Sequence, residues 1–194
     1  MTKSRVEAFS DGVIAILITI MVLELKVPEH ANLDALRPLI PVLLSYVLSF
    51  IYLGIYWNNH HHMFHMVRQV TGGMLWANLH LLFWLSLVPF VTGWMGQNQF
   101  DSLPTAAYGV VMLLAAIAWT ILQHVIIRAQ GPDSPLADAV GSDTKGRLSA
   151  LLYVAAIPLA FVHRWIADGI FAFVALMWLV PDRRIESRLR EEPR

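Results

Sequence analysis

Residues 5–25 read RVEAFSDGVIAILITIMVLEL, and this stretch decides the fold class. Its central part, residues 12–23, holds only glycine, apolar side chains and the single hydroxyl of Thr19. A charged cluster around Asp11 precedes this apolar run, and Glu24 follows it. About 20 apolar residues suffice for a helix to cross the roughly 30 Å hydrocarbon core of a bilayer. The stretch therefore predicts a membrane-spanning helix.

The composition extends this interpretation to the whole chain. Of 194 residues, 57% are hydrophobic and 14% are charged, whereas roughly 25% are charged in an average soluble domain. The net charge is zero and no basic tract is long enough to follow phosphates, which argues against nucleic acid as a partner. The absence of cysteine excludes disulfides, thiolate metal sites and cysteine nucleophiles. The sequence predicts an all-α integral membrane protein whose main surroundings are the lipid bilayer.

Six apolar segments follow one another along the chain. They lie at about residues 6–25, 38–65, 74–94, 105–127, 151–162 and 165–180. The last two are short and are separated only by His163 and Arg164, so we interpret them as a tight hairpin of two spans. The alternative is one long helix broken at Pro158, which would give five spans and place the C-terminus on the other side of the membrane.

The distribution of basic residues separates these two topologies. With six spans and both termini inside, 11 of the 14 lysines and arginines lie on the inner side. Only Lys26, Arg37 and Arg164 lie outside. Cytoplasmic loops carry such an excess of positive charge, so we expect six transmembrane helices with both termini cytoplasmic. Residues 1–194 then form a single domain, with a cytoplasmic loop at about 128–147 and a charged C-terminal tail at about 182–194.

Polar residues inside or beside the predicted helices are the candidates for chemistry. Asp11 lies near a helix N-terminus, where a carboxylate is favoured by the helix dipole, so its spacing alone favours an interface-anchored helix start. His61 and His65 stand four residues apart, a spacing that two ligands of one metal can use. A zinc site needs at least three protein ligands, and no cysteine, aspartate or glutamate stands beside these histidines, so we do not expect a metal site. The remaining intramembrane candidates, whose partners the sequence does not identify, are His80, His124 and Asp168.

The first helix also carries a stripe of side chains on one face. These residues recur at helical spacing: Gly12, Ile16, Thr19, Ile20 and Leu23. One interpretation is the core-facing stripe of an ordinary helix. The other is a pore lining, because rings of apolar side chains can gate water and ions by dewetting.

Three motifs in the first half of the chain resemble those of a potassium-channel family called transmembrane protein 175. The first is R-x-x-x-F-S-D, formed by Arg5, Phe9, Ser10 and Asp11. The second is W-x-x-H, formed by Trp57 and His60, with Phe64 four residues further on. The third pairs Asn78-Leu79 with Leu87-x-Pro89-Phe90. The chain has one set of six helices and so is similar to the prokaryotic form of the family.

The resemblance implies a fold, a function and a location. It implies that the first helix of each chain lines a pore on the axis of a homotetramer in the cell membrane of a prokaryote. It implies a channel that passes potassium and other monovalent cations, with no enzymatic activity and no cofactor. The implied pore residues are a hydrophobic constriction at Ile16, a hydroxyl that aids cation preference at Thr19, and further lining at Ile20 and Leu23.

The resemblance also implies a role for the charged cluster. In the family, a hydrogen-bonded network holds the first helix in place. Its implied members in this chain are Arg5, Ser10, Asp11, His60 and Asn78. Two other functions remain open on the residues alone: a secondary transporter, and a haem- or metal-binding redox protein that uses the histidines of the second segment.

Overall fold

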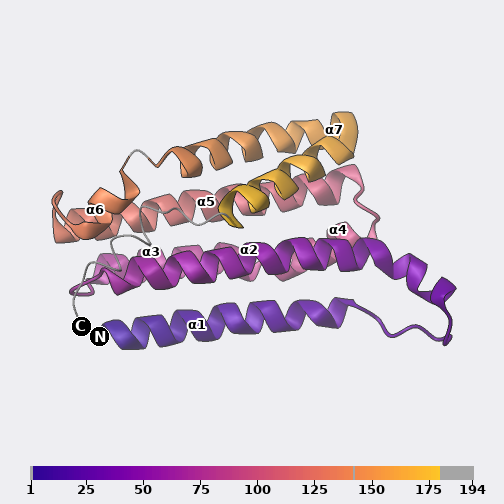
Figure 1. Cartoon of the computed structure of the whole chain (residues 1–194), viewed down its shortest axis with the longest axis horizontal. Helices are drawn as coiled ribbons and strands as arrows, with labels where there is room; N and C mark the ends of the chain where they lie inside the picture. The colour runs from indigo at the N-terminus through magenta and orange to yellow at the C-terminus, as the bar shows by residue number, and fades with distance from the viewer. Residues whose placement is uncertain (1, 142, 180–194) are drawn as a thin grey trace.

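The chain folds into a bundle of long helices that lie side by side (Figure 1). This computed structural model describes residues 2–141 and 143–179, so the tail expected at about 182–194 lies outside the described residues. Within these described residues, five helical stretches are long and apolar enough to cross a membrane, which agrees with the predicted all-α membrane protein. They are Lys3–Glu24, Leu33–His65, Gly72–Gln97, Ser102–Gln130 and Thr144–Leu179.

The first two spans pack against each other at one edge of the bundle. Helix α1 (Lys3–Ile20) continues as the 3₁₀ helix η1 (Met21–Glu24), and η2 (Leu33–Leu39) leads into α2 (Ile40–His65). The Nζ of Lys3 donates to the carbonyl of His65 at 2.6 Å, so the start of α1 meets the end of α2. The two helices are therefore antiparallel, as consecutive membrane spans must be when a short loop joins them.

The third span is divided into two helices. Helix α3 (Gly72–Ser86) ends at Leu87, and α4 (Val88–Gln97) follows directly. Pro89 lies in the first turn of α4, where its missing N–H leaves no helical hydrogen bond unmade. The N–H of Val91 still bonds the carbonyl of Leu87 at 3.1 Å, so the chain continues in the same direction. The sequence predicted this span but not its division.

Helix α5 (Ser102–Gln130) is the central element and packs on α3, α4 and α7. It ends at Gly131, whose φ of +98° is a conformation that glycine adopts without strain. The loop expected at 128–147 contains a short helix, α6 (Pro135–Val140), that the sequence did not predict. Ser134 caps α6 by accepting the N–H of Ala137, and the buried side chain of Leu136 anchors it to the bundle.

Helix α7 (Thr144–Leu179) folds back on itself. Its backbone leaves helical geometry at His163 (φ −160°, ψ 99°), and Figure 1 shows the chain reversing there. The indole N–H of Trp178 donates to the hydroxyl of Ser149 at 2.9 Å, so the second arm returns to the start of the first. The described part of the chain thus passes along the bundle six times. The predicted hairpin is confirmed, and the helix continues through Pro158 rather than breaking at it.

The start of α1, the end of α2 and α6 lie at the same end of the bundle, which we call the α6 end (Figure 1). Close packing between α5 and α7 depends on small residues. A side chain at Gly109 would meet the ring of Phe171 at 3.0 Å, because the two helices approach closely. Membrane helices associate through such packing, since lipid removes the hydrophobic drive between them.

Candidate functional site

Helix α1 has one face packed on the bundle and one face free of it within the described chain. The packed face is formed by Val6, Ser10, Ile14, Leu17 and Met21. The free face, which continues into η1, contains the whole stripe that the sequence singled out: Gly12, Ile16, Thr19, Ile20 and Leu23. Ile16 is 59% exposed and Leu23 is 77% exposed. The stripe is therefore not the core-facing side of α1, and it is available to lipid or to another copy of the chain.

Thr19 is the hydrogen-bonding side chain in the middle of this stripe. Its hydroxyl donates to two carbonyls of its own helix, those of Ala15 and Ile16, each at 3.0 Å. Such back-bonding uses the hydroxyl proton and leaves oxygen lone pairs directed away from the helix. The exposed face of α1 thus presents an acceptor among apolar neighbours, which suits a weakly held cation.

Three of the predicted network residues form one hydrogen-bonded chain across α1, α2 and α3. The amide of Asn78 donates to the hydroxyl of Ser10 at 2.9 Å, and its carbonyl lies 2.8 Å from Nε2 of His60. Ser10 donates in turn to the carbonyl of Val6 at 2.9 Å. All three side chains are buried. Buried polar groups in a bilayer need such partners, and the chain of bonds fixes α1 against its neighbours.

The structure does not bring the other two predicted network members into this chain of bonds. Arg5 is exposed and Asp11 is half-buried, and neither side chain makes a hydrogen bond or ion pair with another described residue. The carboxylates of Asp11 and Glu7 do interact electrostatically with the His60 ring. Asp11 therefore lies beside the network without being hydrogen-bonded to it.

A further contact holds the opposite end of α1, and the sequence did not point to it. The carboxylate of Glu24 accepts the side-chain N–H of Gln97 at 2.6 Å. It also rests on Gly93 of α4, where an added Cβ would lie 2.8 Å from the Glu24 oxygen. The only advance signal is a charged residue directly after an apolar run, since its partners lie about 70 positions away. The contact ties the end of η1 to α4.

The remaining polar candidates have local partners or none. The indole of Trp84 donates to His80 at 2.9 Å, and Nδ1 of His124 lies 2.7 Å from the carbonyl of Thr120. The carboxylate oxygens of Asp168 and the hydroxyl of Thr105 are buried without a hydrogen-bond partner in the described structure. The rings of His61 and His65 stack 6.3 Å apart, and the described residues contain no group of three metal-ligating side chains.

Among the described residues outside the spans, Asp143 has a shifted pKa. Asp143, in the loop before α7, accepts the N–H of Gly146 at 3.2 Å. Burial raises the pKa of the Asp143 carboxyl, and the Gly146 hydrogen bond and the nearby Arg147 and His124 oppose that rise. This carboxylate lies far along the chain from the α1 stripe and belongs to the start of α7.

Comparison with known proteins agrees with this arrangement. Residues 5–89, which contain the three motifs except for Phe90 and include the Ser10–Asn78–His60 chain, match the family described as endosomal/lysosomal potassium channel TMEM175. A protein named potassium channel from Chryseobacterium sp. (strain P1-3) is 55% identical over 98% of this chain and its own full length. Another so named, from Streptomyces collinus, is 34% identical over 91% of each chain.

A solved structure shows the same fold. The crystal structure of a lysosomal potassium-selective channel TMEM175 homolog from Chamaesiphon minutus matches with a TM-score of 0.80 and 29% identity. The match covers 94% of this chain and 97% of that one. Since the family consists of ion channels, the chain is not an enzyme. The chain belongs to the TMEM175 family of potassium channels, as a prokaryotic member of it.

Proposed function

We propose that four copies of this chain form a potassium-permeable cation channel in a prokaryotic cell membrane, with α1 of each copy lining the pore. In this arrangement Ile16 forms the hydrophobic constriction, Thr19 aids the preference for potassium, and Ile20 and Leu23 extend the lining. Both termini and the α6 end face the cytoplasm, in keeping with the excess of lysine and arginine at that end. Potassium passes through as a transient ion rather than as a bound cofactor.

The observation that carries this proposal is the exposed stripe on α1. A single chain cannot enclose a pathway with one helical face, so copies must surround an axis. The same face could instead contact lipid, which is also apolar. Thr19 favours the pore, because a hydroxyl gains nothing in hydrocarbon but can replace part of the hydration shell of an ion. The channel names of the relatives support the same choice.

A secondary transporter is the alternative from another functional class. Transporters are typically built from internal repeats, with Gly- or Pro-interrupted helices around a substrate site at the membrane midplane. Pro158 lies inside a continuous helical arm, and the break in α7 at His163 is the turn of the hairpin. These features favour a channel. A redox role for the second-helix histidines has less support, since His60 is buried and bonded to Asn78.

The test is ion flux through purified protein in liposomes, with potassium and sodium compared under the same gradients. We expect flux of both ions with potassium favoured. Ile20→Trp should block the pathway, because four indoles would fill the space on the axis. Ile166→Trp is the matched control, since Ile166 is similarly exposed but lies on α7. Equal ion flux through the two variants would show that α1 does not line the pore. Flux that requires a counter-transported ion would indicate a transporter.

A further inference from the structure

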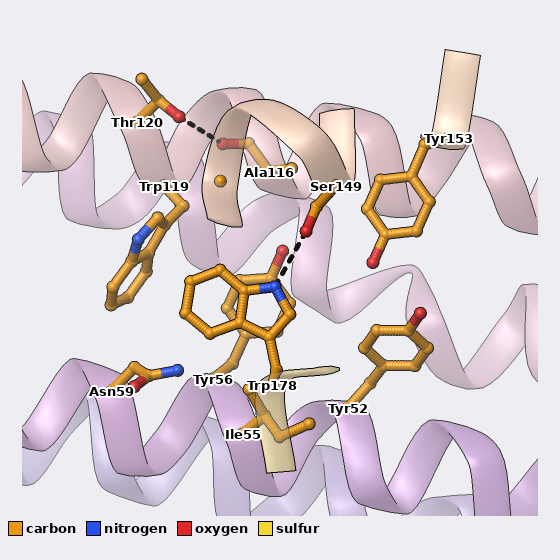
Figure 2. Close-up of a pocket in the computed structure, with 11 residues that line it drawn as sticks. Tyr52, Ile55, Tyr56, Asn59, Ala116, Trp119, Thr120, Ser149, Tyr153 and Trp178 are labelled. Carbon is orange, nitrogen blue, oxygen red and sulfur yellow. Dashed lines mark hydrogen bonds between the residues drawn. The ribbon is translucent and has the colours of Figure 1, made fainter. Parts of the chain in front are cut away.

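A pocket opens between α2, α5 and both arms of α7, away from the α1 stripe. The space between these helices is about 470 Å³, including its open mouth. Figure 2 shows side chains from the three helices directed into one common space. The wall is mainly aromatic, with Tyr52, Tyr56, Trp119, Tyr153 and Trp178 among its members.

Some of the polar groups in the wall are already satisfied. Tyr52 donates its hydroxyl proton to the carbonyl of Phe171 at 2.6 Å. Trp178 donates to Ser149 at 2.9 Å, and Thr120 donates to the carbonyl of Ala116 at 3.0 Å. These bonds hold the wall in place and leave their donors unavailable to a ligand.

Three other hydrogen-bond donors in the wall have no partner. They are the hydroxyl of Tyr56, the side-chain amide of Asn59 and the indole N–H of Trp119, none of which hydrogen-bonds to another described residue. Tyr56 and Asn59 lie one turn apart on α2, and the ring of Tyr56 meets that of Trp119 edge-on at 6.0 Å. Donors inside a largely apolar pocket require acceptors, because an unpaired polar group is costly away from water. The wall thus suits an apolar molecule that carries acceptor oxygens.

Charged residues lie at one edge of the pocket. Lys145 places its ammonium 5.9 Å from the centre of the Trp178 ring, which is part of the wall. Asp143 accepts the N–H of Gly146, another residue of the wall, at 3.2 Å. An ammonium at this edge can bind a phosphate-bearing group. This edge belongs to the first turns of α7, at the α6 end of the bundle. Tyrosine and tryptophan side chains are enriched where membrane proteins cross a membrane–water interface.

We propose that this pocket binds a membrane phospholipid from the leaflet at the α6 end. One acyl chain lies against the aromatic wall, the ester carbonyls accept from Tyr56, Asn59 and Trp119, and the phosphate lies at the Lys145 edge. The lipid would contact α2, α5 and both arms of α7. It would thereby stabilise the α7 hairpin on the side of the bundle away from α1. The proposal concerns binding alone and does not depend on ion conduction.

Native mass spectrometry on the delipidated full-length protein in detergent tests the proposal, with phosphatidylglycerol added in mixed micelles. Ala116→Phe places a ring in the pocket and should abolish the tightest lipid binding. The double variant Tyr56→Phe/Asn59→Leu keeps the shape but removes two donors, and we expect roughly tenfold weaker binding. Tyr46→Phe is the matched control, because it removes a tyrosine hydroxyl on α2 outside the pocket and should bind like the wild type.

Three results would overturn the proposal. One is lipid binding by the double variant that equals binding by the wild type. The double variant tests the proposal even if Ala116→Phe does not fold. Another is lipid binding by Tyr46→Phe that is weakened as much as in the double variant, which would indicate a general effect of losing a hydroxyl. The third concerns thermal stability. If inorganic phosphate alone stabilises the wild type as much as phosphatidylglycerol does, the site binds phosphate and has no place for the acyl chain.

Discussion

At the scale of single residues, Ile16 and Thr19 differ in what they can offer an ion. An isoleucine side chain holds no water, so in the proposed tetramer a ring of four would raise the free energy of a hydrated ion by dewetting. The hydroxyl of Thr19 is anchored to its own helix by two hydrogen bonds and keeps its lone pairs outward. In the proposed pore, we therefore expect Ile16 to set the barrier and Thr19 to distinguish between ions.

Widening the ring at Ile16 should increase conduction. We expect Ile16→Ala and Ile16→Asn to raise cation flux severalfold, since a wider or wetter constriction lowers the dewetting barrier. Flux into proteoliposomes measures this directly. Ile117→Ala, at an exposed isoleucine of α5, is the control and should conduct like the wild type. Unchanged flux in both Ile16 variants, with normal assembly, would place the constriction elsewhere.

Removing the hydroxyl of Thr19 should weaken ion discrimination. Thr19→Val retains the side-chain shape, so we expect intact folding and a reversal potential that separates potassium from sodium less well. Thr120→Val is the matched control, because Thr120 makes the same type of bond to the carbonyl four residues earlier but lies on α5. If both variants give the reversal potential of the wild type, Thr19 takes no part in selectivity.

Asn78 carries the hydrogen-bonded chain between three helices. Asn78→Leu keeps a side chain of similar size but leaves His60 and Ser10 without their partner, at a cost of about 1–3 kcal/mol in the free energy of unfolding. Thermal melting of the purified protein measures the loss. Asn98→Ala removes only an exposed bond to the carbonyl of Trp94 and should melt close to the wild type. Equal melting temperatures in the two variants would show that the chain of bonds adds no stability.

At the scale of elements, the joint between α2 and α4 depends on a glycine. A Cβ on Gly96 would lie 2.8 Å from the Cα of Val42 and 3.3 Å from the carbonyl oxygen of Pro41. Backbone atoms cannot move aside as a flexible side chain does, so the helices would have to separate. The pairing of these two spans therefore requires glycine at this position.

Gly96→Ala should consequently destabilise the protein by about 1–3 kcal/mol, as overpacking does in other cores. Gly54→Ala is the matched control, because an added Cβ there meets no atom within 4 Å and alanine favours the helix. We expect Gly54→Ala to melt at or above the wild-type temperature. A Gly96→Ala protein as stable as Gly54→Ala would contradict the close approach of α2 and α4.

At the scale of the whole molecule, Arg5 and Asp11 are the residues whose role an assembled channel would define. Neither side chain has a hydrogen-bonding or ion-pair partner in the described single chain, although both residues belong to the motif at the start of α1. Charges near the membrane are costly without partners. We therefore expect their partners to come from the neighbouring copies in the proposed tetramer.

Arg5→Ala and Asp11→Ala should then lower the temperature at which the tetramer dissociates more than they alter selectivity. Size-exclusion chromatography after heating measures assembly, and circular dichroism measures the fold of the chain. Arg37→Ala is the control, because the Arg37–Asp34 pair is largely exposed and contributes little. A stable, conducting Asp11→Ala tetramer with an altered response to pH would instead make Asp11 a titrating sensor.

The sequence by itself determined the features that repeat locally along the chain. Apolar segments of bilayer length predicted the spans, the dipeptide His163-Arg164 predicted the hairpin, and the helical spacing of Ile16 to Leu23 predicted a shared face. The physical reason is that a bilayer forces each segment to satisfy its own backbone, so the hydropathy of a segment predicts its structure without knowledge of its neighbours.

Only the tertiary structure decided which side chains meet across helices. The bond from Asn78 to Ser10 joins residues 68 positions apart, and Glu24 reaches Gln97 over 73 positions. The pocket beside Tyr56 depends on three helices and on where the second arm of α7 ends. These contacts depend on the rotation and register of each helix against the next, which packing of small residues sets and no local pattern encodes.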